Sequence, residues 1–239
     1  MQTLVAARNL RKTYRGRAVV DGVDLELRRG ETVAVIGPNG AGKSTTLDLI
    51  LGLKKADAGT VRFWRDDPLG RIGVQLQQTP FFPGLSALEN LKLFASFYRV
   101  RLTDARAREL LDTCGLLDAA GTEASRLSGG QQKRLAIAAS LVHDPELVFL
   151  DEPTAALDPK ARREIRMLIG KLAKAGTTVV FTSHDMEEVH RLADRVILIV
   201  KGRIAADGTP DALCAAHGVD GLEELYVKLT DETNGEVRL

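Results

Sequence analysis

The sequence is poor in cysteine, nearly neutral in net charge and without long apolar runs. Its two cysteines, Cys114 and Cys214, are too few for a disulfide framework or a thiolate metal site, and they are typical of a reducing compartment. A formal net charge of +1 gives no electrostatic preference for nucleic acid or acidic lipid. No apolar run approaches the roughly 20 residues that a membrane-spanning helix requires, and the N-terminus lacks a signal-peptide core. We therefore expect a cytosolic protein with no nucleic-acid partner.

One glycine-rich stretch has the pattern of a strand, a tight loop and a helix. Thr32–Ile36 is a short apolar run rich in β-branched residues, and Lys43 begins a segment with apolar residues at helical spacing. From Gly37 to Ser44 the chain satisfies the pattern G-x-x-x-x-G-K-[ST], in which Gly42 is the second fixed glycine. This pattern predicts a phosphate-binding loop.

The residue types in this loop suit the chemistry of phosphate binding. With little or no side chain at Gly37, Gly40 and Gly42, consecutive backbone N–H groups can converge on a phosphate oxygen. The N-terminus of the following helix adds about half a positive charge. Lys43 supplies a full charge to the outer phosphates, and Ser44 offers a hydroxyl group to Mg²⁺. The alternative is a glycine-rich turn that merely joins a strand to a helix, and we favour nucleotide binding.

Strands precede and follow this loop. Residues 19–27 alternate apolar and charged side chains with a period of two, which predicts a half-buried antiparallel strand, and residues 4–10 are a weaker candidate to pair with it. Later strands alternate with helices, as in a parallel sheet with crossover helices. The remaining strands are expected at residues 59–64, 71–76, Leu147–Leu150, 177–183 and Arg195–Val200.

Between about residues 80 and 141 the pattern is helical, without a strand signal. Ser86 and Glu89 form a capping box ahead of one helix, and a second helix runs from about Asp104 to a stop at Gly115. We therefore expect a single α/β domain with a mixed, mostly parallel sheet, an N-terminal antiparallel β region and an inserted helical subdomain. Its expected parts are a core of about residues 1–79 and 142–210, a helical subdomain of about 80–141 and a helical tail of about 211–239.

Acidic residues follow the apolar strand that ends at Leu150. Because parallel strands present their loops at one edge of a sheet, we expect Asp151–Glu152, the phosphate loop and His184 to converge on one ligand. Asp151 is placed for a second Mg²⁺ contact through water. Glu152 is placed to polarise a water molecule for in-line attack. The alternatives are that both acids end a strand in solvent and that His184 is an ordinary loop histidine.

The segment of residues 127–131, LSGGQ, is the second distinctive pattern. Ser128 and Gln131 can form a capping box for the helix that follows. Gly129 and Gly130 then lie in the first turn, where a glycine costs about 1 kcal/mol relative to alanine. Something must require this bare backbone, and a helix N-terminus stripped of side chains is a second anion site.

These motifs, in this order, resemble those of the nucleotide-binding subunits of ATP-binding-cassette (ABC) transporters, over nearly the whole chain from Leu4 to about Ala206. GPNGAGKST resembles the family's phosphate loop, LSGGQ its signature and LVFLDEP its magnesium and base strand. The resemblance implies a P-loop NTPase core that hydrolyses ATP with Mg²⁺. The implied ATP-binding residues are Tyr14 as an adenine-stacking aromatic, Gly37, Pro38, Asn39, Gly40, Ala41, Gly42, Lys43, Ser44, Thr45, Gln77 and His184.

The resemblance also implies roles for these residues and a second copy of the subunit. The implied catalytic residues are Lys43, Gln77, Glu152 and His184, and the implied Mg²⁺ ligands are Ser44, Gln77 and Asp151. Two cassettes, expected as a homodimer, pair head to tail, so that each ATP also contacts the signature of the other copy, Ser128, Gly129, Gly130 and Gln131. Asp158 belongs to the D-loop, where Ala155 and Ala156 stand at positions at which a serine is common.

A transmembrane permease subunit is the second implied partner, and it would hold the protein at the inner face of the cell membrane. Phe81, Phe82 and Leu85 are candidates to receive the permease, with local packing as the alternative. Residues 75–91 and the tail at 222–230 resemble those of drug and polyketide exporters, and we expect no added regulatory domain of the kind found in many sugar importers. Export is therefore the prediction. An importer ATPase, or a soluble cassette ATPase that acts on ribosomes or DNA, is the alternative.

Overall fold

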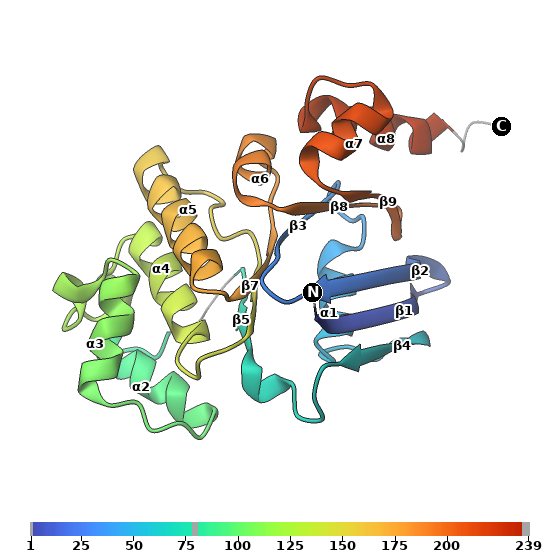
Figure 1. Cartoon of the computed structure of the whole chain (residues 1–239). Coiled ribbons are helices and arrows are strands. Elements are labelled where there is room, and N and C mark those ends of the chain that lie inside the picture. The colour runs from blue at the N-terminus through green and yellow to red at the C-terminus, as the bar shows by residue number, and fades with distance from the viewer. Residues whose placement is uncertain (1, 78–80, 236–239) are drawn as a thin grey trace. The chain divides into compact units, whose positions relative to one another are not determined.

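The computed structural model describes residues 2–77 and 81–235, and the chain divides into two compact units (Figure 1). The first unit joins Met1–Asp66 to Val180–Leu239, and the second is the continuous segment Asp67–Val179. Strand β7 (Thr178–Thr182) contains the boundary.

A three-stranded antiparallel sheet, in the order β2-β1-β4, forms part of the first unit (Figure 1). Strands β1 (Thr3–Tyr14) and β2 (Arg17–Arg28) form a hairpin, and β4 (Ala58–Phe63) pairs with the other edge of β1. The predicted N-terminal strand pair is confirmed, although β1 continues beyond Leu10. The register shifts just before Leu10, where Asn9 has a φ of 48°. This irregularity interrupts the apolar alternation and explains why the sequence pattern was weak.

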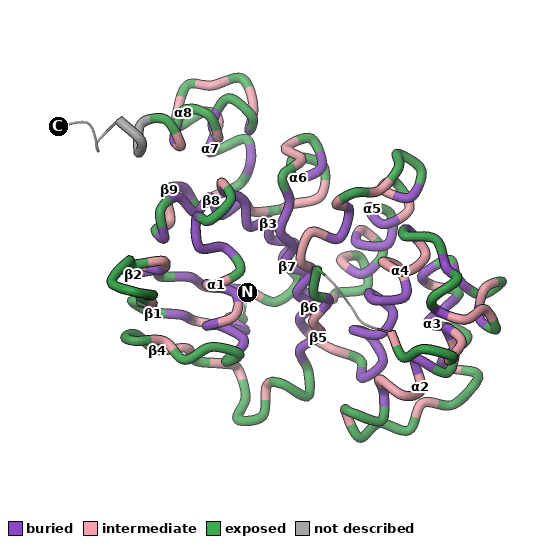
Figure 2. The backbone as a smooth tube through the Cα atoms, turned by 180° about the vertical axis from the view of Figure 1, so that it is seen from behind, coloured by how far each residue is buried: buried purple, intermediate pink, exposed green. Residues whose placement is uncertain are grey.

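The rest of the first unit contains the strand that leads into the phosphate loop. Strand β3 (Thr32–Ile36) pairs in parallel with β8 (Arg195–Val200), and β9 (Arg203–Gly208) pairs antiparallel with β8. All five residues of β3 are buried (Figure 2), as is usual for a parallel strand covered on both faces. The helices of this unit are α1 (Lys43–Ile50), α6 (Met186–Leu192), α7 (Pro210–His217) and α8 (Leu222–Gly235).

The second unit combines two parallel strands with four helices. Strands β5 (Ile72–Gln75) and β6 (Leu147–Leu150) pair in parallel. The helices are α2 (Ala87–Phe97), α3 (Asp104–Thr113), α4 (Gly129–Ser140) and α5 (Pro159–Lys174), with short 3-10 turns at Leu69–Arg71, Leu117–Ala119 and Ala124–Arg126. With both parallel and antiparallel pairs present, the predicted mixed α/β fold is confirmed.

The boundary of the second unit differs from the predicted edges of the helical subdomain. Strand β5 packs closely on α4, because Gly73 has no side chain: a Cβ atom there would overlap the carbonyl oxygen of Ser140. This contact groups the strand with the helices rather than with the first unit. The division into a core and an inserted subdomain stays a prediction. Residues 78–80, in the expected break after β5 and in the exporter-like segment, lie outside the described residues.

Helix boundaries coincide with capping residues, and the predicted capping box of Ser86 and Glu89 is confirmed. Ser86 and Glu89 form the capping box of α2, and Asp158 caps α5 ahead of Pro159 at the first helical position. Helix α5 buries an apolar stripe made of Ile165, Leu168, Ile169 and Leu172. Over residues 81–141 the structure has helices and turns apart from one isolated bridge between Ser86 and Glu123.

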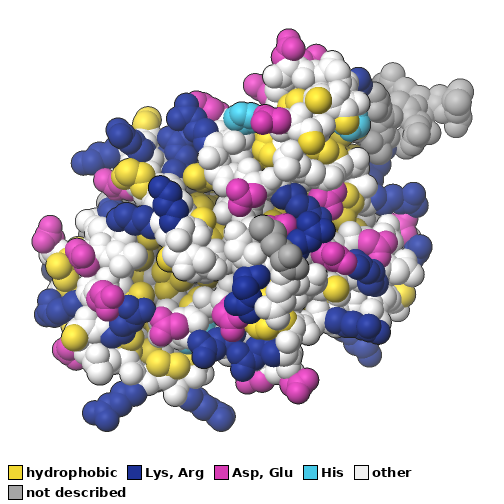
Figure 3. Space-filling model, in the orientation of Figure 1, with side chains coloured by type: hydrophobic (Ala, Val, Ile, Leu, Met, Phe, Trp, Pro, Cys, Tyr) yellow, Lys and Arg dark blue, Asp and Glu magenta, His cyan; other side chains and the backbone are white. Residues whose placement is uncertain are grey.

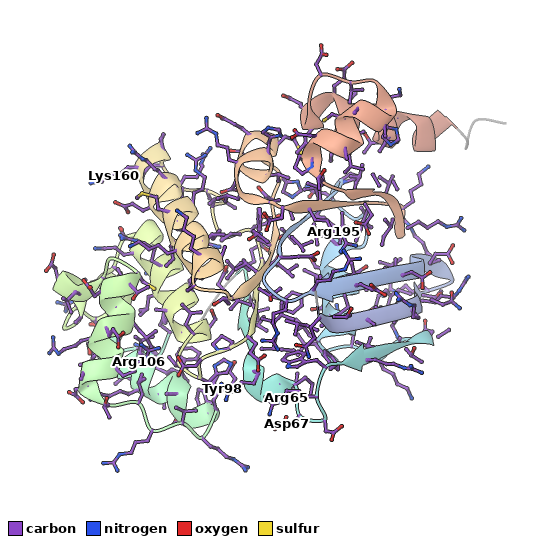
Figure 4. The ribbon with its side chains drawn as sticks, in the orientation of Figure 1. Arg65, Asp67, Tyr98, Arg106, Lys160 and Arg195 are labelled. Carbon is purple, nitrogen blue, oxygen red and sulfur yellow. The ribbon has the colours of Figure 1, made fainter. Side chains whose placement is uncertain are left out.

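Basic and acidic side chains are interspersed on the face shown in Figure 3, in keeping with the small net charge. One ion pair joins neighbouring strands of the first unit: Arg195 of β8, labelled in Figure 4, donates to Asp207 of β9 through Nε at 2.5 Å and Nη2 at 2.6 Å. This forked geometry fixes the β8–β9 pair at its end. Across the described ranges, every helix is too short or too polar to span a membrane.

Candidate functional site

The phosphate loop connects β3 to α1 in the first unit. Three of its glycines have positive φ angles, 147° at Gly37, 76° at Gly40 and 103° at Gly42, a region that residues with a side chain rarely adopt. A Cβ atom at Gly37 would overlap the carbonyl oxygen of Ile199, and one at Gly42 would overlap that of Val19. The loop therefore requires glycine at both positions, for its backbone shape and because neighbouring main chain lies against it.

Helix α1 begins without a side-chain cap. Gly42 is its N-cap residue, and no acidic residue lies in its first turn, so the positive end of the helix is left available for an anion. The Nζ of Lys43 is buried and donates to the carbonyl oxygens of Gly37 at 2.7 Å and Pro38 at 3.1 Å. Phosphate oxygens can replace these acceptors when a nucleotide binds. Of the other loop residues, Asn39, Gly40 and Ser44 are exposed, Thr45 is half-buried and Ala41 is buried.

Tyr14 ends β1 in the same unit, and its side chain is 41% exposed. The Nζ of Lys12 lies 5.5 Å from the centroid of the Tyr14 ring, within range of a cation–π interaction. Lys12 also pairs with Asp57 at 2.8 Å. Hydrogen bonds from Lys12 and from the backbone amide of Thr13 hold the pKa of Asp57 below its usual value. These contacts fix the end of the strand and leave the ring accessible, while adenine stacking stays a prediction.

His184 lies in the loop after β7 and is exposed. The loop is held on both sides of it. Ser183 Oγ donates to a carboxylate oxygen of Glu188 at 2.7 Å, and Asp185 caps α6 by accepting from the backbone amide of Glu188 at 3.0 Å. His184 also lines a hollow with Tyr226 of α8. The backbone therefore presents His184 on the surface of the first unit, and its catalytic role stays a prediction.

Gln77 and the acids after β6, predicted from separate parts of the chain, lie together in the second unit. The Nε2 of Gln77 donates to Oε2 of Glu152 at 3.3 Å. The backbone amide of Asp151 donates to the carbonyl oxygen of Gln75 at 2.9 Å, which continues the bonding of β5 with β6 past the end of β6. Glu152 then has a φ of 45°, a left-handed conformation that costs roughly 1–2 kcal/mol for a residue with a side chain. Convergence of these residues with the phosphate loop stays a prediction.

Lys133 on α4 joins this group, and the sequence analysis did not predict it. Its Nζ donates to the carbonyl oxygens of Gln77 at 3.0 Å and Glu152 at 3.4 Å. Burial lowers the pKa of Lys133, and the negative charges of Asp151 and Glu152 act in the opposite direction. The signal that could have revealed it is its spacing. Lys133 follows Gly129 by four residues and therefore lies on the same face of the helix.

The two signature glycines differ in their surroundings. Ser128 and Gln131 form the predicted capping box, with the amide of Gln131 donating to Ser128 Oγ at 3.3 Å and the amide of Ser128 donating to Gln131 Oε1 at 2.9 Å. Gly130 is buried, and a Cβ atom there would lie 2.7 Å from the Cβ of Ala161 on α5. Gly129 is exposed, and a Cβ atom there would have its nearest neighbour at 4.0 Å. Packing within one chain therefore explains Gly130 but not Gly129.

Asp158, the predicted D-loop acid, is the N-cap of α5. Its Oδ1 accepts from the backbone amides of Lys160 at 2.9 Å and Ala161 at 3.0 Å, and Lys160 is labelled in Figure 4 at the start of the helix. The hydrogen bond from Ala161 is the main reason that the pKa of Asp158 lies below its usual value. Ala156, two residues earlier, has a φ of 59°. The aspartate therefore stabilises the turn that leads into α5, whatever it contacts in a second copy.

The proposed Mg²⁺ ligands are Ser44, Gln77 and Asp151, which offer a hydroxyl, an amide and a carboxylate oxygen. Mg²⁺ prefers oxygen ligands, and it is usually held by one or two carboxylates together with substrate phosphates rather than by an all-protein cage. Within the described residues, no three His, Cys, Asp or Glu side chains are grouped to hold a metal by themselves. The donor set therefore fits an ion that arrives with a nucleotide.

Four phenylalanines form a cluster at α2, two from the segment before the helix and two from the helix itself. Phe81 and Phe82 pack edge-on against Phe94, with ring centroids 6.4 and 6.2 Å away, and Phe97 lies 6.0 Å from Phe82. Phe81 and Phe82 therefore do pack locally, as the alternative interpretation expected. Phe82 and Phe97 remain 40% and 61% exposed, so the permease-docking role stays a prediction. Leu85, the third candidate, is half-buried.

Comparison with known proteins adds a family to this geometry. A family model described as ABC transporter matches residues 20–155. Linearmycin resistance ATP-binding protein LnrL of Bacillus subtilis is 37% identical over 238 residues, which cover 96% of this chain and 76% of that protein. Nod factor export ATP-binding protein I of Paraburkholderia xenovorans is 38% identical over 225 residues, covering 90% and 74%. A solved dimeric ATP-binding cassette in a post-hydrolysis state with ADP and phosphate is 34% identical, with a TM-score of 0.76 over 86% of this chain and 98% of that one.

Alanine at position 130 is expected to destabilise the protein, whereas alanine at position 129 is not. The methyl group in Gly130→Ala would lie 2.7 Å from the Cβ of Ala161. Such overpacking typically costs about 1–3 kcal/mol, which outweighs the gain of at most about 1 kcal/mol for alanine over glycine in a helix. Chemical denaturation of the full chain measures the free energy of unfolding, with Gly129→Ala as the matched control.

A compensating change makes this test specific to the contact. Ala161→Gly in the Gly130→Ala background removes the opposing methyl group and should recover most of the lost stability. If Gly130→Ala and Gly129→Ala had the same free energy of unfolding, the packing explanation for Gly130 would be contradicted.

Asp158 is expected to make the stability of the protein depend on pH. Its folded pKa is lowered, chiefly by the bond from the amide of Ala161, so its contribution is present above the unfolded pKa and is lost as the pH falls through the folded pKa. Asp158→Asn keeps a capping oxygen but does not titrate. The difference in thermal midpoint between the parent chain and this variant should shrink as the pH falls from about 7 to about 3. A difference that stays constant over that range would rule out the assignment.

Proposed function

Because the chain belongs to the ABC transporter family, as an ATP-binding and ATP-hydrolysing subunit, we propose that it powers export through a separate transmembrane partner. The observation that carries the direction is the naming of its relatives, one for linearmycin resistance and one for Nod factor export. The exporter-like patterns at residues 75–91 and 222–230 favour the same direction. The permease partner would hold the subunit at the inner face of the cell membrane, with the phenylalanine cluster beside α2 as the contact.

The proposed working unit is a homodimer in which each ATP contacts both copies. A dimeric cassette with 34% identity to this chain supports the pairing. Ser128 and Gly129 are exposed at the N-terminus of α4, where the positive end of the helix and a backbone without side chains suit a phosphate. Gln131 holds the capping box, and Gly130 lets the first turn pack on α5. Packing within one chain does not explain the glycine at position 129, because the space beside it is open. Contact with a second copy would explain it.

Nucleotide binding is assigned to the phosphate loop and Tyr14. The main-chain N–H groups of residues 37–45, of which Pro38 has none, surround the phosphates. Lys43 exchanges its carbonyl acceptors for phosphate oxygens. Tyr14 stacks on the adenine. Ser44, Gln77 and Asp151 would hold Mg²⁺, which neutralises charge on the transferring phosphate when bound.

Hydrolysis is assigned to Glu152, with Gln77 and His184 in supporting roles. The carboxylate of Glu152 takes a proton from the water that attacks the γ-phosphorus, and a positioned base of this kind contributes ~10²–10⁴ in rate. Gln77 already donates to that carboxylate at 3.3 Å and thereby limits its orientation. His184, exposed after β7, contacts the γ-phosphate. ATP hydrolysis then ends the contact between the two copies.

Two substitutions separate binding from chemistry. Lys43→Ala removes the charge that faces the phosphates and should abolish measurable ATP affinity. Glu152→Gln should leave ATP affinity unchanged, lower turnover by about 10²-fold or more, and trap an ATP-dependent dimer. Equilibrium nucleotide binding, steady-state ATPase rates and size-exclusion chromatography with ATP measure these outcomes.

Exposed residues of the same types provide the controls. Lys55→Ala and Glu109→Gln make the same chemical changes at exposed positions and should bind and hydrolyse ATP like the parent chain. Full turnover by Glu152→Gln would show that another group is the base.

The direction of transport is tested with inside-out vesicles that contain this subunit together with its permease partner. Linearmycin and a Nod factor, which appear in the names of two relatives, serve as probes. Export predicts ATP-dependent accumulation inside the vesicles, which the Glu152→Gln complex should lose. ATP-dependent release of a preloaded probe would instead identify an importer.

A further inference from the structure

Two loops of the second unit meet around one lysine of α4. A cavity of ≈ 310 Å³ is lined by Gln77 from the loop after β5, by Gly129 and Lys133 from α4, and by Ala156 and Leu157 from the D-loop. Lys133 also bonds Glu152, which lies earlier in the same loop as Ala156 and Leu157. Each of these loops carries a residue assigned to ATP hydrolysis or to the second copy, whereas Lys133 has no role in the assignments above.

The Lys133 side chain bonds main chain rather than a single acidic partner. Its Nζ donates to the carbonyl oxygen of Gln77 at 3.0 Å and to that of Glu152 at 3.4 Å. The side chains of these same two residues bond each other at 3.3 Å. One ammonium group therefore fixes the backbone on both sides of the contact between the amide of Gln77 and the carboxylate of Glu152.

The backbone at Glu152 needs such support. Its φ of 45° lies in the left-handed region, where a residue with a side chain is held only if its surroundings favour that conformation. The carbonyl oxygen of Glu152 itself accepts the hydrogen bond from Lys133, so this bond acts directly on the peptide unit that aims the carboxylate.

The half-buried position of Lys133 has an energetic cost. Burial lowers the pKa of its ammonium, which means that the surroundings disfavour the charge, although Asp151 and Glu152 offset part of this. A purely apolar side chain of similar length would avoid the cost while still packing beside Ala136 and Leu157 of the cavity. The charge is therefore explained by the carbonyl oxygens that it bonds and by the neighbouring acids.

We propose that Lys133 is a positioning residue for ATP hydrolysis, which holds the main chain at Gln77 and Glu152 so that the carboxylate of Glu152 stays aimed. This inference rests on the proposed role of Glu152 as the base. It also gives α4 a second task, because Lys133 lies one turn after Gly129 on the same helix. Contact of a partner's nucleotide with the start of α4 is thereby connected to the base of the chain that contains α4.

The test compares Lys133→Met, which keeps the length of the side chain but removes the donor, with Lys133→Arg, which keeps a charged donor. In the full chain, Lys133→Met should lower kcat by about 10- to 100-fold, because a small misplacement of a catalytic group has effects of this size, with KM for ATP changed by less than about twofold. Lys133→Arg should restore kcat to within about threefold of the parent chain. Lys174→Met, at an exposed site on α5, is the matched control and should be unaffected.

A double variant distinguishes positioning from a general structural role. In the Glu152→Gln background, Lys133→Met should lower the residual rate no further, because both changes act through one carboxylate, and the ATP-dependent dimer should still form. Loss of that dimer, or a further fall in rate equal to the fall in the parent chain, would overturn the proposal. A kcat for Lys133→Met equal to that of Lys174→Met would also overturn it.

The outcomes separate this inference from the function on which it rests. Full activity of Glu152→Gln would refute the base assignment itself, whereas an inactive Glu152→Gln with a fully active Lys133→Met would refute only the role of Lys133. If thermal unfolding shows that Lys133→Met does not fold, Lys133→Gln takes its place. Its neutral amide can donate to only part of the same acceptor pair, and the same loss of kcat with unchanged KM is expected.

Discussion

In each unit, a lysine ammonium bonded to main-chain carbonyl oxygens stabilises loop backbone. In the first unit Lys43 donates to Gly37 and Pro38, and in the second Lys133 donates to Gln77 and Glu152. Loops with positive φ angles leave the regular bonding of strands and helices, so their carbonyl groups need other donors. An ammonium supplies a charged donor without a rigid shape. The two lysines differ in the acceptors open to them. Charged phosphate oxygens are stronger acceptors than the carbonyls around Lys43, whereas Lys133 stays bonded to the carbonyls of Gln77 and of Glu152, the proposed base.

Missing side chains are the second constraint, and they serve two distinct purposes. At Gly37 and Gly42 the main chain of the same unit lies where a Cβ atom would be, and at Gly130 the methyl group of Ala161 does. These glycines are required for folding. Gly129 has open space around it, so the helix propensity that it sacrifices is not explained by packing inside the chain. An intermolecular role is therefore better supported for Gly129 than for the LSGGQ motif taken as a whole.

Much of the fold could be predicted from the sequence because local chemistry determines it. The strands at Thr32–Ile36, Leu147–Leu150 and Arg195–Val200 have the predicted bounds, since apolar runs between glycine, proline and acidic residues leave few alternatives. The interruption at Asn9 and the close contact of Gly73 with Ser140 could not be predicted, because both depend on neighbours distant in sequence. The contacts of Lys133 could not be predicted for the same reason. Its helical face was evident, but its acceptors belong to loops that only folding brings together.

The link between α4 and Glu152, the proposed base, is sensitive to small movements because of its hydrogen-bond lengths. The contact of Lys133 with the carbonyl of Glu152 is 3.4 Å long and that with Gln77 is 3.0 Å, and hydrogen bonds weaken steeply beyond about 3.5 Å. A shift of α4 by a few tenths of an ångström is therefore enough to lose the first bond while the second persists. Glu152 is in a left-handed conformation, so its backbone depends on such a bond from its surroundings. A packed helix that moves as a unit can thus change the aim of one carboxylate without rearranging the fold around it.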